Sequence, residues 1–253
     1  GYSDWASTQV VLPPEPQALP YYEDFEAGVP NGWNLSNATN GWYVGTAASN
    51  GGSRSLYVSN DGGQSNVYDN QITSYSYAYF TISLEQESSV GISYDWRCDG
   101  ESTYDYSRVF FVPASLRPSF VAGYSNSISH SGAPSGWIMA DEGRLNKSSS
   151  WNTMTKGVVL DEGLYYVVIC WLNDYSAGDN PPTAIDNIRI DVSSCVFDGT
   201  IDISDVGKTS AVASWSESGN ASQWEVLVTT ESNLDLAAES PVLVNSSTYN
   251  MSG

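Results

Sequence analysis

Side chains that commonly perform acid, base or nucleophilic chemistry are scarce in this sequence. Nucleophilic triads and zinc sites need histidine in suitable company, and the chain has one histidine, His130, in the loop sequence SNSISHSGAPSG. A lone histidine in a Gly- and Ser-rich loop is more often solvated than catalytic. The sequence also has no G-x-x-x-x-G-K phosphate loop, no Cys-x-x-Cys pair and no basic patch interleaved with aromatics, so nucleotide, zinc and nucleic-acid functions are not supported.

One group of acidic residues is a candidate for catalysis, because a carboxylate pair across a cleft can hydrolyse a glycosidic bond. The group is Asp99, Glu101 and Asp105, close to Arg97 at the end of a predicted strand. The simpler interpretation is that Asp99 and Glu101 flank Gly100 in a solvated loop, with Arg97 as an ion-pair partner. Because no nucleophile, base and orienting group converge, we expect no catalytic residue and no enzyme activity.

The three cysteines, Cys98, Cys170 and Cys195, say little about the redox compartment. An odd number allows at most one disulfide within the chain and leaves at least one thiol unpaired. Cys98 and Cys170 each lie in an apolar strand pattern, where a small buried hydrophobe is a more frequent role than a bridge. Whether these two are bridged stays open at this point, since spacing cannot establish disulfide geometry.

Aromatic residues are the remaining functional signal, because Trp and Tyr offer a flat apolar face together with a polar group. Most of them are expected in the core, including Trp96 and Trp171, which lie in alternating strand patterns. Aromatics in or beside loops can instead be displayed to a ligand. The candidate ligand-binding residues are Tyr104, Tyr106, Tyr124 and Trp137.

The charge balance limits the partners. The chain of 253 residues carries 9 Lys and Arg against 29 Asp and Glu, a formal net charge of −20. Such a field repels phosphates and anionic membrane surfaces, so we expect no nucleic acid among the partners, which should be neutral, cationic or metallic. No apolar run approaches the roughly 18 residues that a membrane span requires, so no membrane insertion is expected. The chain is typical of the mature part of an exported protein.

The elements that must position these residues are predicted to be short strands. Runs rich in Tyr, Val, Ile and Phe recur between clusters of Gly, Asn, Asp and Ser, which is the spacing of an antiparallel sandwich. The segment SNDGGQSN, residues 59–66, resembles an Asp-box but is interpreted as a self-braced turn around Asp61. The predicted strands are 21–26, 42–45, 55–59, 78–84, 89–98, 107–112, 155–160, 163–173 and 183–192.

The chain is predicted to be all-β with two domains. Residues 1–20, which contain four prolines, are a linker or an extended leading strand. Residues 21–195 form an antiparallel jelly-roll β-sandwich. Residues 196–253 have a shorter alternation that resembles the first half of a fibronectin type III domain, with TSAVASW as its second strand and QWEVLV as its third. Half a sandwich leaves an apolar face and free edges, so we expect further domains or strands after Gly253.

Five segments together resemble a known family. EDFEAGVPNGW at residues 23–33, SLYVS at 55–59, ISYDWRCDGE at 92–101, WLND at 171–174 and PPTAIDNI at 181–188 follow the order found in MAM-like and cleaved-adhesin jelly rolls, the galactose-binding-like modules attached to gingipain-type bacterial peptidases. The resemblance covers residues 20–196. It implies a secreted or cell-surface bacterial protein.

The resemblance also implies a structural Ca²⁺ where the first and last strands meet. Members of the family often hold the ion with a Glu from an F-E motif and an Asp from an I-D motif, which are Glu26 and Asp186 here. Calcium takes six to eight oxygen ligands, so carbonyls of the Gly-rich loop 50–54 could complete the shell. Asp24, Asn187 and Ser53 are further candidate ligands.

The function expected from these observations is a non-catalytic extracellular adhesin or ligand-binding module that recognises a host protein or a glycan. Two alternatives stay open: ancillary domains of a larger secreted peptidase or glycoside hydrolase, and a structural spacer. A fold cannot choose among them, because function resides in sites.

Overall fold

The computed structural model describes residues 13–193, 197–217, 222–229 and 240–252. Its contacts divide the chain into two compact units. The first comprises Gly1–Glu85, Gly91–Val158 and Glu162–Asp191, and the second comprises Gln86–Val90, Val159–Asp161 and Val192–Gly253. The predicted boundary residue, Cys195, lies outside the described residues. The domain limits proposed from the sequence stay predictions.

The first sheet of the larger unit has the strand order β3-β4-β11-β6-β9, and β1 pairs with β11. All pairings of β1, β3 and β4 are antiparallel. Because β1 pairs with β11, the beginning and the end of this unit's chain lie side by side, as the resemblance requires of a calcium site. The bounds are β1 Tyr21–Glu23, β3 Gly41–Gly45, β4 Ser55–Ser59, β6 Ser88–Cys98, β9 Ser148–Leu160 and β11 Ala184–Ser193.

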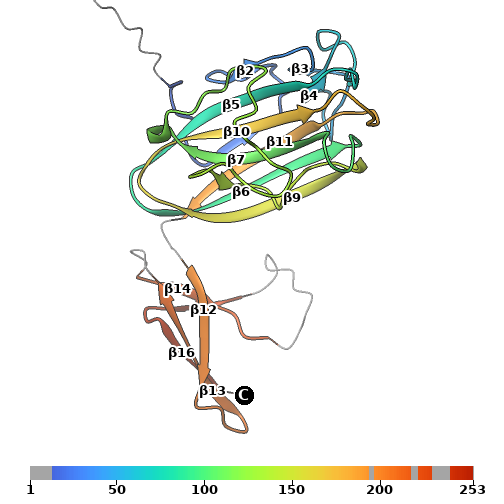
Figure 1. Ribbon diagram of the computed structural model, residues 1–253. Helices are drawn as coiled ribbons and strands as arrows, with labels where there is room; N and C mark the ends of the chain where they lie inside the picture. Colours follow the sequence, from blue (N-terminus) through green and yellow to red (C-terminus); the bar gives the residue numbers. More distant parts are fainter. Residues whose placement is uncertain (1–12, 194–196, 218–221, 230–239, 253) are drawn as a thin grey trace, which may run out of the picture. The chain divides into compact units, whose positions relative to one another are not determined.

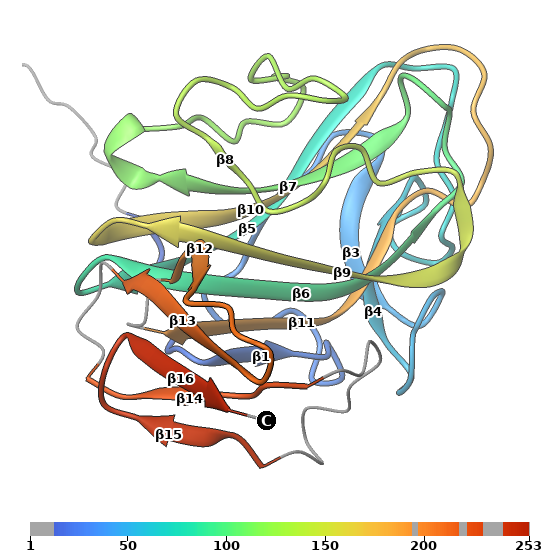
Figure 2. The ribbon, with the colours of Figure 1, turned by 90° about the horizontal axis from the view of Figure 1, so that it is seen from below.

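The second sheet has the order β2-β5-β10-β7-β8, again with antiparallel pairs. Its centre is the long strand β10, which pairs along its whole length with β5. Figure 1 shows β5, β10 and β7 lying as one layer in front of β11, β6 and β9, and Figure 2 shows the same two layers from below. The bounds are β2 Asn34–Ser36, β5 Ser74–Leu84, β7 Tyr106–Pro113, β8 Ile138–Met139 and β10 Gly163–Asn173.

The core lies between these two sheets. Phe80 of β5 is fully buried and packs against Tyr21 of β1, with ring centroids 5.0 Å apart, and stacks on Trp33 at 4.5 Å. Polar contacts also cross the interior: Ser107 Oγ of β7 donates to Thr183 Oγ1 over 2.7 Å. The predicted antiparallel jelly-roll sandwich is therefore confirmed for this unit.

The second sheet is covered on its other face too. Tyr77, Phe110, Val168 and Cys170 form a buried cluster on that face with Phe120, which comes from the segment between β7 and β8. Two covered faces explain why β7 is buried at seven of its eight positions instead of alternating. The same segment also supplies four residues that line the cavity described below, namely Ser125, Ile128, Ser129 and His130.

Most predicted strands agree with the structure, and the differences have local causes. The strands predicted at 55–59 and 163–173 have the observed bounds. The first strand ends at Glu23 instead of residue 26, because Phe25 adopts a left-handed φ of 59° that cannot continue a strand. Trp171 is buried as predicted, whereas Trp96 is only half-buried.

The leading segment is extended where it is described. Gln17 pairs with β5: its amide donates to the Thr81 carbonyl over 2.7 Å. Thr81 Oγ1 in turn donates to the Pro14 carbonyl over 2.8 Å. Residues 13–20 thus contact β5 through one isolated bridge and two hydrogen bonds, and the choice between a linker and a leading strand stays a prediction.

The second unit contains two small sheets among its described residues: β12-β13-β16 and β14-β15. Trp215 and Trp224 meet edge to face at 6.0 Å, and Ile201 and Ile203 are 56% and 53% exposed. The fibronectin type III-like interpretation of this unit stays a prediction. The bounds are β12 Phe197–Ser204, β13 Ser210–Glu217, β14 Trp224–Val226, β15 Val242–Val244 and β16 Thr248–Ser252.

The described residues contain one helical element, the 3₁₀ turn Ala114–Leu116. No helix in this part of the chain is long and apolar enough to cross a membrane. Cys98 and Cys170 are both buried and free. Burial raises the pKa of the Cys98 thiol to about 12, so this thiol stays protonated and acts as a small core hydrophobe.

Candidate functional site

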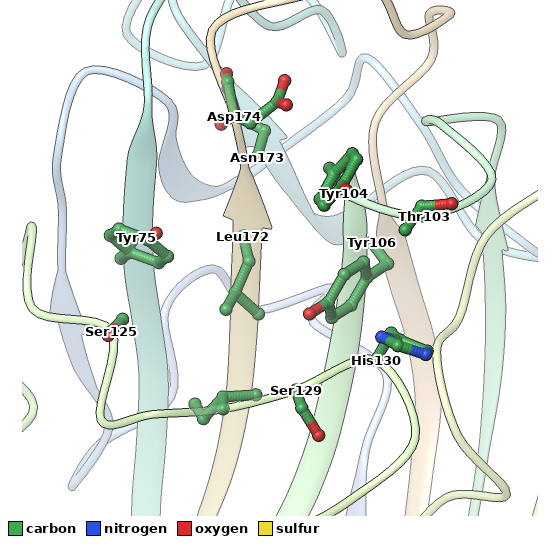
Figure 3. Close-up of a pocket in the computed structure, with 11 residues that line it drawn as sticks. Tyr75, Thr103, Tyr104, Tyr106, Ser125, Ser129, His130, Leu172, Asn173 and Asp174 are labelled. Carbon is green, nitrogen blue, oxygen red and sulfur yellow. The ribbon is translucent and has the colours of Figure 1, made fainter.

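A cavity of about 290 Å³ opens at the end of the second sheet (Figure 3). The strand ends of β5, β7 and β10 form its floor, and the loops before β7 and after it form its walls. Its lining combines tyrosine rings and aliphatic side chains with hydroxyl, imidazole, amide and carboxylate groups, a combination typical of ligand sites. The lining residues are Tyr75, Thr103, Tyr104, Tyr106, Ser125, Ile128, Ser129, His130, Leu172, Asn173 and Asp174.

Three tyrosines surround the cavity on different elements. Tyr75 is half-buried on β5, Tyr106 is buried at the start of β7, and Tyr104 is 57% exposed in the loop before β7. Figure 3 shows the rings of Tyr104 and Tyr106 on one side and the ring of Tyr75 on the other, with Leu172 of β10 between them. Burial raises the pKa of the Tyr106 hydroxyl to about 12, so this hydroxyl is a neutral donor at physiological pH.

The two ends of the cavity differ in chemistry. Asn173 and Asp174 lie at one end, and Ser129 and His130 at the other (Figure 3). The Asn173 amide is committed to the fold: it donates to the Ile72 carbonyl over 2.6 Å and accepts from Trp171 Nε1 over 2.9 Å. Asp174 is half-buried and accepts from its own turn, the Ser176 amide at 2.8 Å. Its carboxylate therefore keeps capacity for a ligand.

Asp174 belongs to an acidic cluster with Glu101 and Asp105. One carboxylate oxygen of each residue lies within 4.8 Å of the other two, so the group could hold a metal ion. We did not predict this grouping from the sequence, because Asp174 follows β10 whereas the other two precede β7. Only the fold brings the two loops together.

Asp105 is the buried member of this cluster. Its side chain is fully buried and accepts from Tyr68 Oη over 2.5 Å and from the Asp174 amide over 3.1 Å. Gly178 packs on this pair: a Cβ there would lie 2.1 Å from Asp105 Oδ2, so only glycine fits. Burial, opposed by these hydrogen bonds, raises the pKa of Asp105 to about 6.

This raised pKa predicts a pH dependence of stability. At pH values between the ordinary pKa of Asp and about 6, Asp105 is protonated in the folded state and ionised in the unfolded state. The free energy of unfolding should therefore rise as the pH falls from neutral towards 4. Glu101 and Asp174, which face Asp105, reinforce the direction by repulsion. Urea titrations across this range should show a smaller rise for Asp105→Asn than for the wild type. Identical pH dependence in both proteins would contradict the assignment.

A buried ion pair supports the opposite end of the cavity. Arg108 of β7 and Asp141 are both fully buried and joined by two hydrogen bonds, Nε to Oδ2 at 2.8 Å and Nη2 to Oδ1 at 2.9 Å. Arg108 Nη1 also donates to the Ser129 and Gly132 carbonyls, at 2.5 and 2.9 Å. The guanidinium thus holds the loop that carries His130, whose side chain is exposed.

The predicted ligand residues divide into two groups. Tyr104 and Tyr106 line the cavity. Tyr124 is 56% exposed beside it, and its carbonyl accepts from Tyr77 Oη. Trp137 packs edge to face on Phe110 at 5.3 Å in the outer cluster and does not line the cavity. A ligand role for Tyr124 and Trp137 stays a prediction.

The predicted calcium ligands Glu26 and Asp186 both face the loop 50–54. Glu26 Oε1 accepts from the Ser53 and Arg54 amides, each over 2.8 Å, and Oε2 accepts from Ser53 Oγ over 2.8 Å. These bonds lower the pKa of Glu26. Gly52 adopts a φ of 46°, and a Cβ there would lie 2.3 Å from Glu26 Oε1, so the loop can approach the carboxylate only with glycine.

Asp186 meets the same loop from β11. Its Oδ2 accepts from the Asn50 amide over 2.7 Å, and its Oδ1 accepts from the Asn187 amide over 2.9 Å. A third carboxylate, Asp95 of β6, accepts from the side-chain amides of Asn50 at 2.8 Å and Asn187 at 2.9 Å. Burial, and then the charges of Asp95 and Glu26, raise the pKa of Asp186 to about 6. The site thus carries acidic charge that the hydrogen bonds only partly offset.

The other three predicted ligands, Asp24, Ser53 and Asn187, make hydrogen bonds at the edge of this site. Asp24 caps the turn after β1, accepting from the Glu26 amide over 3.2 Å. Ser53 is bound to Glu26 as described, and Asn187 holds the Asn50 carbonyl over 2.9 Å. The oxygens here spread more widely than those of the Glu101–Asp105–Asp174 cluster. Glu26 Oε2 and both Asp186 oxygens each accept one hydrogen bond and keep a second lone pair, so the donors suit Ca²⁺ in kind.

Two other sequence interpretations can be compared with the structure. The Asp61 turn is self-braced: Oδ1 accepts from Ser59 Oγ at 2.6 Å and from the Gln64 amide at 2.9 Å. Arg97 differs from expectation, because it donates to Asn66 Oδ1 over 3.0 Å and lies over the Trp151 ring at 5.5 Å. The ion pairs found among the described residues do not include Arg97.

The two face-to-face antiparallel sheets place the larger unit among all-β sandwiches of the jelly-roll class. No family model and no curated protein sequence matches the chain. Similar solved structures include the xylan-binding CBM22-1 domain of Paenibacillus barcinonensis Xyn10C, at 12% identity and a TM-score of 0.43, covering 70% of this chain and 96% of that one. The C-terminal family 22 carbohydrate-binding module of Clostridium thermocellum Xyn10B is similar at 15% identity and a TM-score of 0.40, covering 73% of this chain and 100% of that one.

The K3 cleaved adhesin domain of Lys-gingipain from Porphyromonas gingivalis is also similar, at 17% identity and a TM-score of 0.39, covering 67% of this chain and 95% of that one. Structural similarity at such low sequence identity bears on the fold alone. What the site binds must be argued from its own residues.

Proposed function

We propose that the chain is a non-catalytic ligand-binding module and that its ligand is a glycan held in the cavity between Tyr75, Tyr104 and Tyr106. The observation that carries this proposal is the cavity itself: tyrosine rings from two strands and a loop converge with hydroxyl, imidazole and carboxylate groups. A sugar ring presents C–H groups on its faces and hydroxyls around its edge. The cavity offers matching surfaces for both.

The cavity size and the state of its polar groups support a short glycan segment. About 290 Å³ suits a small ligand better than a flat protein surface. Ser129 and His130 at one end and Asp174 at the other are partly or fully solvent-accessible, so they can exchange water for sugar hydroxyls at small cost. Exposed Tyr124 lies beside the cavity, where a second sugar unit would emerge.

Replacing Tyr104 tests the site. Tyr104→Ala removes an exposed ring, so the fold should persist while the affinity for the bound glycan falls about tenfold, the size of one lost stacking contact. The glycan would be chosen on an array and measured by calorimetric titration. Tyr124→Ala is the companion variant, and an equal loss there would show that the ligand extends beyond the cavity. Unchanged affinity in Tyr104→Ala would refute the assigned site.

The biological setting of this proposal is an adhesin or binding module displayed outside a bacterial cell. A second candidate is an ancillary domain pair of a larger secreted peptidase or glycoside hydrolase. The same cavity serves both, since an ancillary module also binds a glycan. The full length of the gene product distinguishes them, because a catalytic region beyond this chain would favour the second.

The account predicts no turnover by the chain itself. Asp105 is buried under Tyr68, and the hydrogen bonds found among the described residues join neither a histidine nor a cysteine to the carboxylates of Asp99 and Glu101. Common glycosides and peptides should therefore remain intact when they are incubated with the purified chain at concentrations that saturate ligand binding. Hydrolysis that Asp99→Asn or Glu101→Gln abolishes would overturn this prediction.

The proposal includes a structural Ca²⁺ held by Glu26 and Asp186, with the Asn50 carbonyl, Asp95 and Ser53 as further oxygen donors. Support comes from three carboxylates gathered on one Gly-rich loop, where the hydrogen bonds found among the described residues come from backbone amides, hydroxyls and Asn side chains and none comes from a Lys or Arg side chain. When bound, the ion would supply positive charge that joins the turn after β1 to β11. It would take no part in ligand chemistry.

A further inference from the structure

The Asp174 end of the cavity carries acidic side chains that form no ion pair with a Lys or Arg among the described residues. Asp174 lines the cavity, and oxygens of Glu101 and Asp105 lie within 4.8 Å of its own. The eleven lining residues, all within the described part of the chain, include no Lys or Arg. A carboxylate in a partly enclosed site acts on a ligand more strongly than one in open water.

The Lys and Arg residues nearest to the Asp174 end of the cavity are paired with other carboxylates or lie at the His130 end. Arg108 is paired with Asp141, and Lys147 is paired with Asp179 at 3.3 Å. Arg144 is exposed, and its amide donates to the His130 carbonyl over 3.1 Å, which places its backbone beside the His130 end. The cavity therefore has one acidic end, at Asp174.

The rings beside that acidic end add to the attraction for a cation. Figure 3 shows Tyr104 close to Asp174 and Asn173, with Tyr106 below it on β7. The face of a tyrosine ring attracts an ammonium group electrostatically, and a carboxylate gives it a charge-assisted hydrogen bond. A neutral hydroxyl would receive only the weaker neutral bond.

We propose, building on the glycan-binding function above, that the cavity selects a sugar carrying a free amino group and holds its ammonium between Asp174 and the Tyr104 ring. The amino group enters at the Asp174 end, and the sugar ring lies against Tyr106 and Tyr75. The overall charge of −20 steers such a ligand towards the protein and repels acidic sugars.

A matched pair of oligosaccharides tests the proposal. Chitotriose, a trimer of glucosamine, and its fully N-acetylated form differ only in the charge and the acetyl groups on nitrogen. Calorimetric titrations would be run on the intact chain with a chelator present, at a slightly acidic pH where the amine is charged. We expect chitotriose to bind about tenfold more tightly, and the advantage to shrink as salt screens the charge.

The Asp174→Asn variant keeps an acceptor for the Ser176 amide but removes the charge, so the preference for chitotriose should largely disappear. Glu85→Gln makes the same change in net charge at an exposed position after the far end of β5, and it should keep the preference. Preference retained in Asp174→Asn, or lost equally in Glu85→Gln, would overturn the assignment to Asp174.

Further outcomes separate this inference from the proposed function. Equal binding of the charged and acetylated trimers would refute the selection for an amino group while leaving glycan binding intact. Binding of neither trimer, together with an empty glycan array, would refute the glycan function itself. Nα-acetyl-lysine amide is the third ligand. If it binds more tightly than chitotriose, the ammonium group that the cavity recognises belongs to a lysine side chain of a protein, and the proposal of an amino sugar is refuted.

Discussion

Asp141→Asn is expected to lower the free energy of unfolding by about 3 to 5 kcal/mol, the largest effect of any single change considered for this protein. The substitution leaves the Arg108 guanidinium charged and buried without its bidentate partner. Asp141 also accepts from the Val109 amide over 2.7 Å, so the start of the covered strand β7 loses support. Urea titration followed by circular dichroism measures the loss.

The double variant Arg108→Met/Asp141→Asn separates charge from packing. Removing both charges should restore part of the stability, so the double variant should be at least as stable as Asp141→Asn alone. The double variant should also bind the ligand less tightly than the wild type, because the carbonyls of Ser129 and Gly132 have lost their donor. Two results would contradict a coupled buried pair. One is a loss of unfolding free energy in the double variant that equals the sum of the losses in the two single variants, and the other is a loss below about 1 kcal/mol in Asp141→Asn.

Calcium is expected to raise the melting temperature of the larger unit. An ion that binds only the folded state stabilises it by RT ln(1 + [L]/Kd), about 2.7 kcal/mol at 100 times Kd. Mg²⁺ should do less, because it prefers a tight octahedral shell and retains its waters. Scanning calorimetry in chelator and in Ca²⁺ measures the difference, and identical melting temperatures would exclude the structural site.

Variants locate the ion. Glu26→Gln and Asp186→Asn should each abolish the Ca²⁺-dependent rise. In chelator Asp186→Asn should melt at the same or a slightly higher temperature, because Asp95 and Glu26 repel the native carboxylate and raise its pKa. Glu101→Gln is the matched control. If Glu101→Gln abolishes the rise and Glu26→Gln does not, the ion belongs in the cluster with Asp105 and Asp174.

The strands were predictable where short-range patterns determine them. SLYVS and the run from Gly163 to Asn173 are bounded by turn residues, and both strands have the predicted bounds. β9 begins at Ser148 instead of residue 155, because SSSWNT is too polar to indicate a strand and acquires its strand geometry from pairing with β6. β2 is three residues long and has no pattern to detect.

The sites depended on long-range contacts, so the sequence predicted them in part. Glu26 and Asp186 were found through family resemblance, and the fold does bring both to loop 50–54. Asp95 was missed, although an aspartate between Tyr94 and Trp96 in an apolar strand is an unusual signal. The cavity could not be foreseen, because Phe120 and its segment cover the outer face of the second sheet only in the folded chain.

NMR mapping of the bound glycan on the isotope-labelled chain shows whether the cavity is the binding site. Amide shifts caused by the ligand should gather at Tyr75, Tyr104, Tyr106, His130 and Asp174, and Tyr104→Ala should suppress them together. Shifts gathered elsewhere on the larger unit, or on the second unit alone, would contradict the claim that this cavity is the binding site.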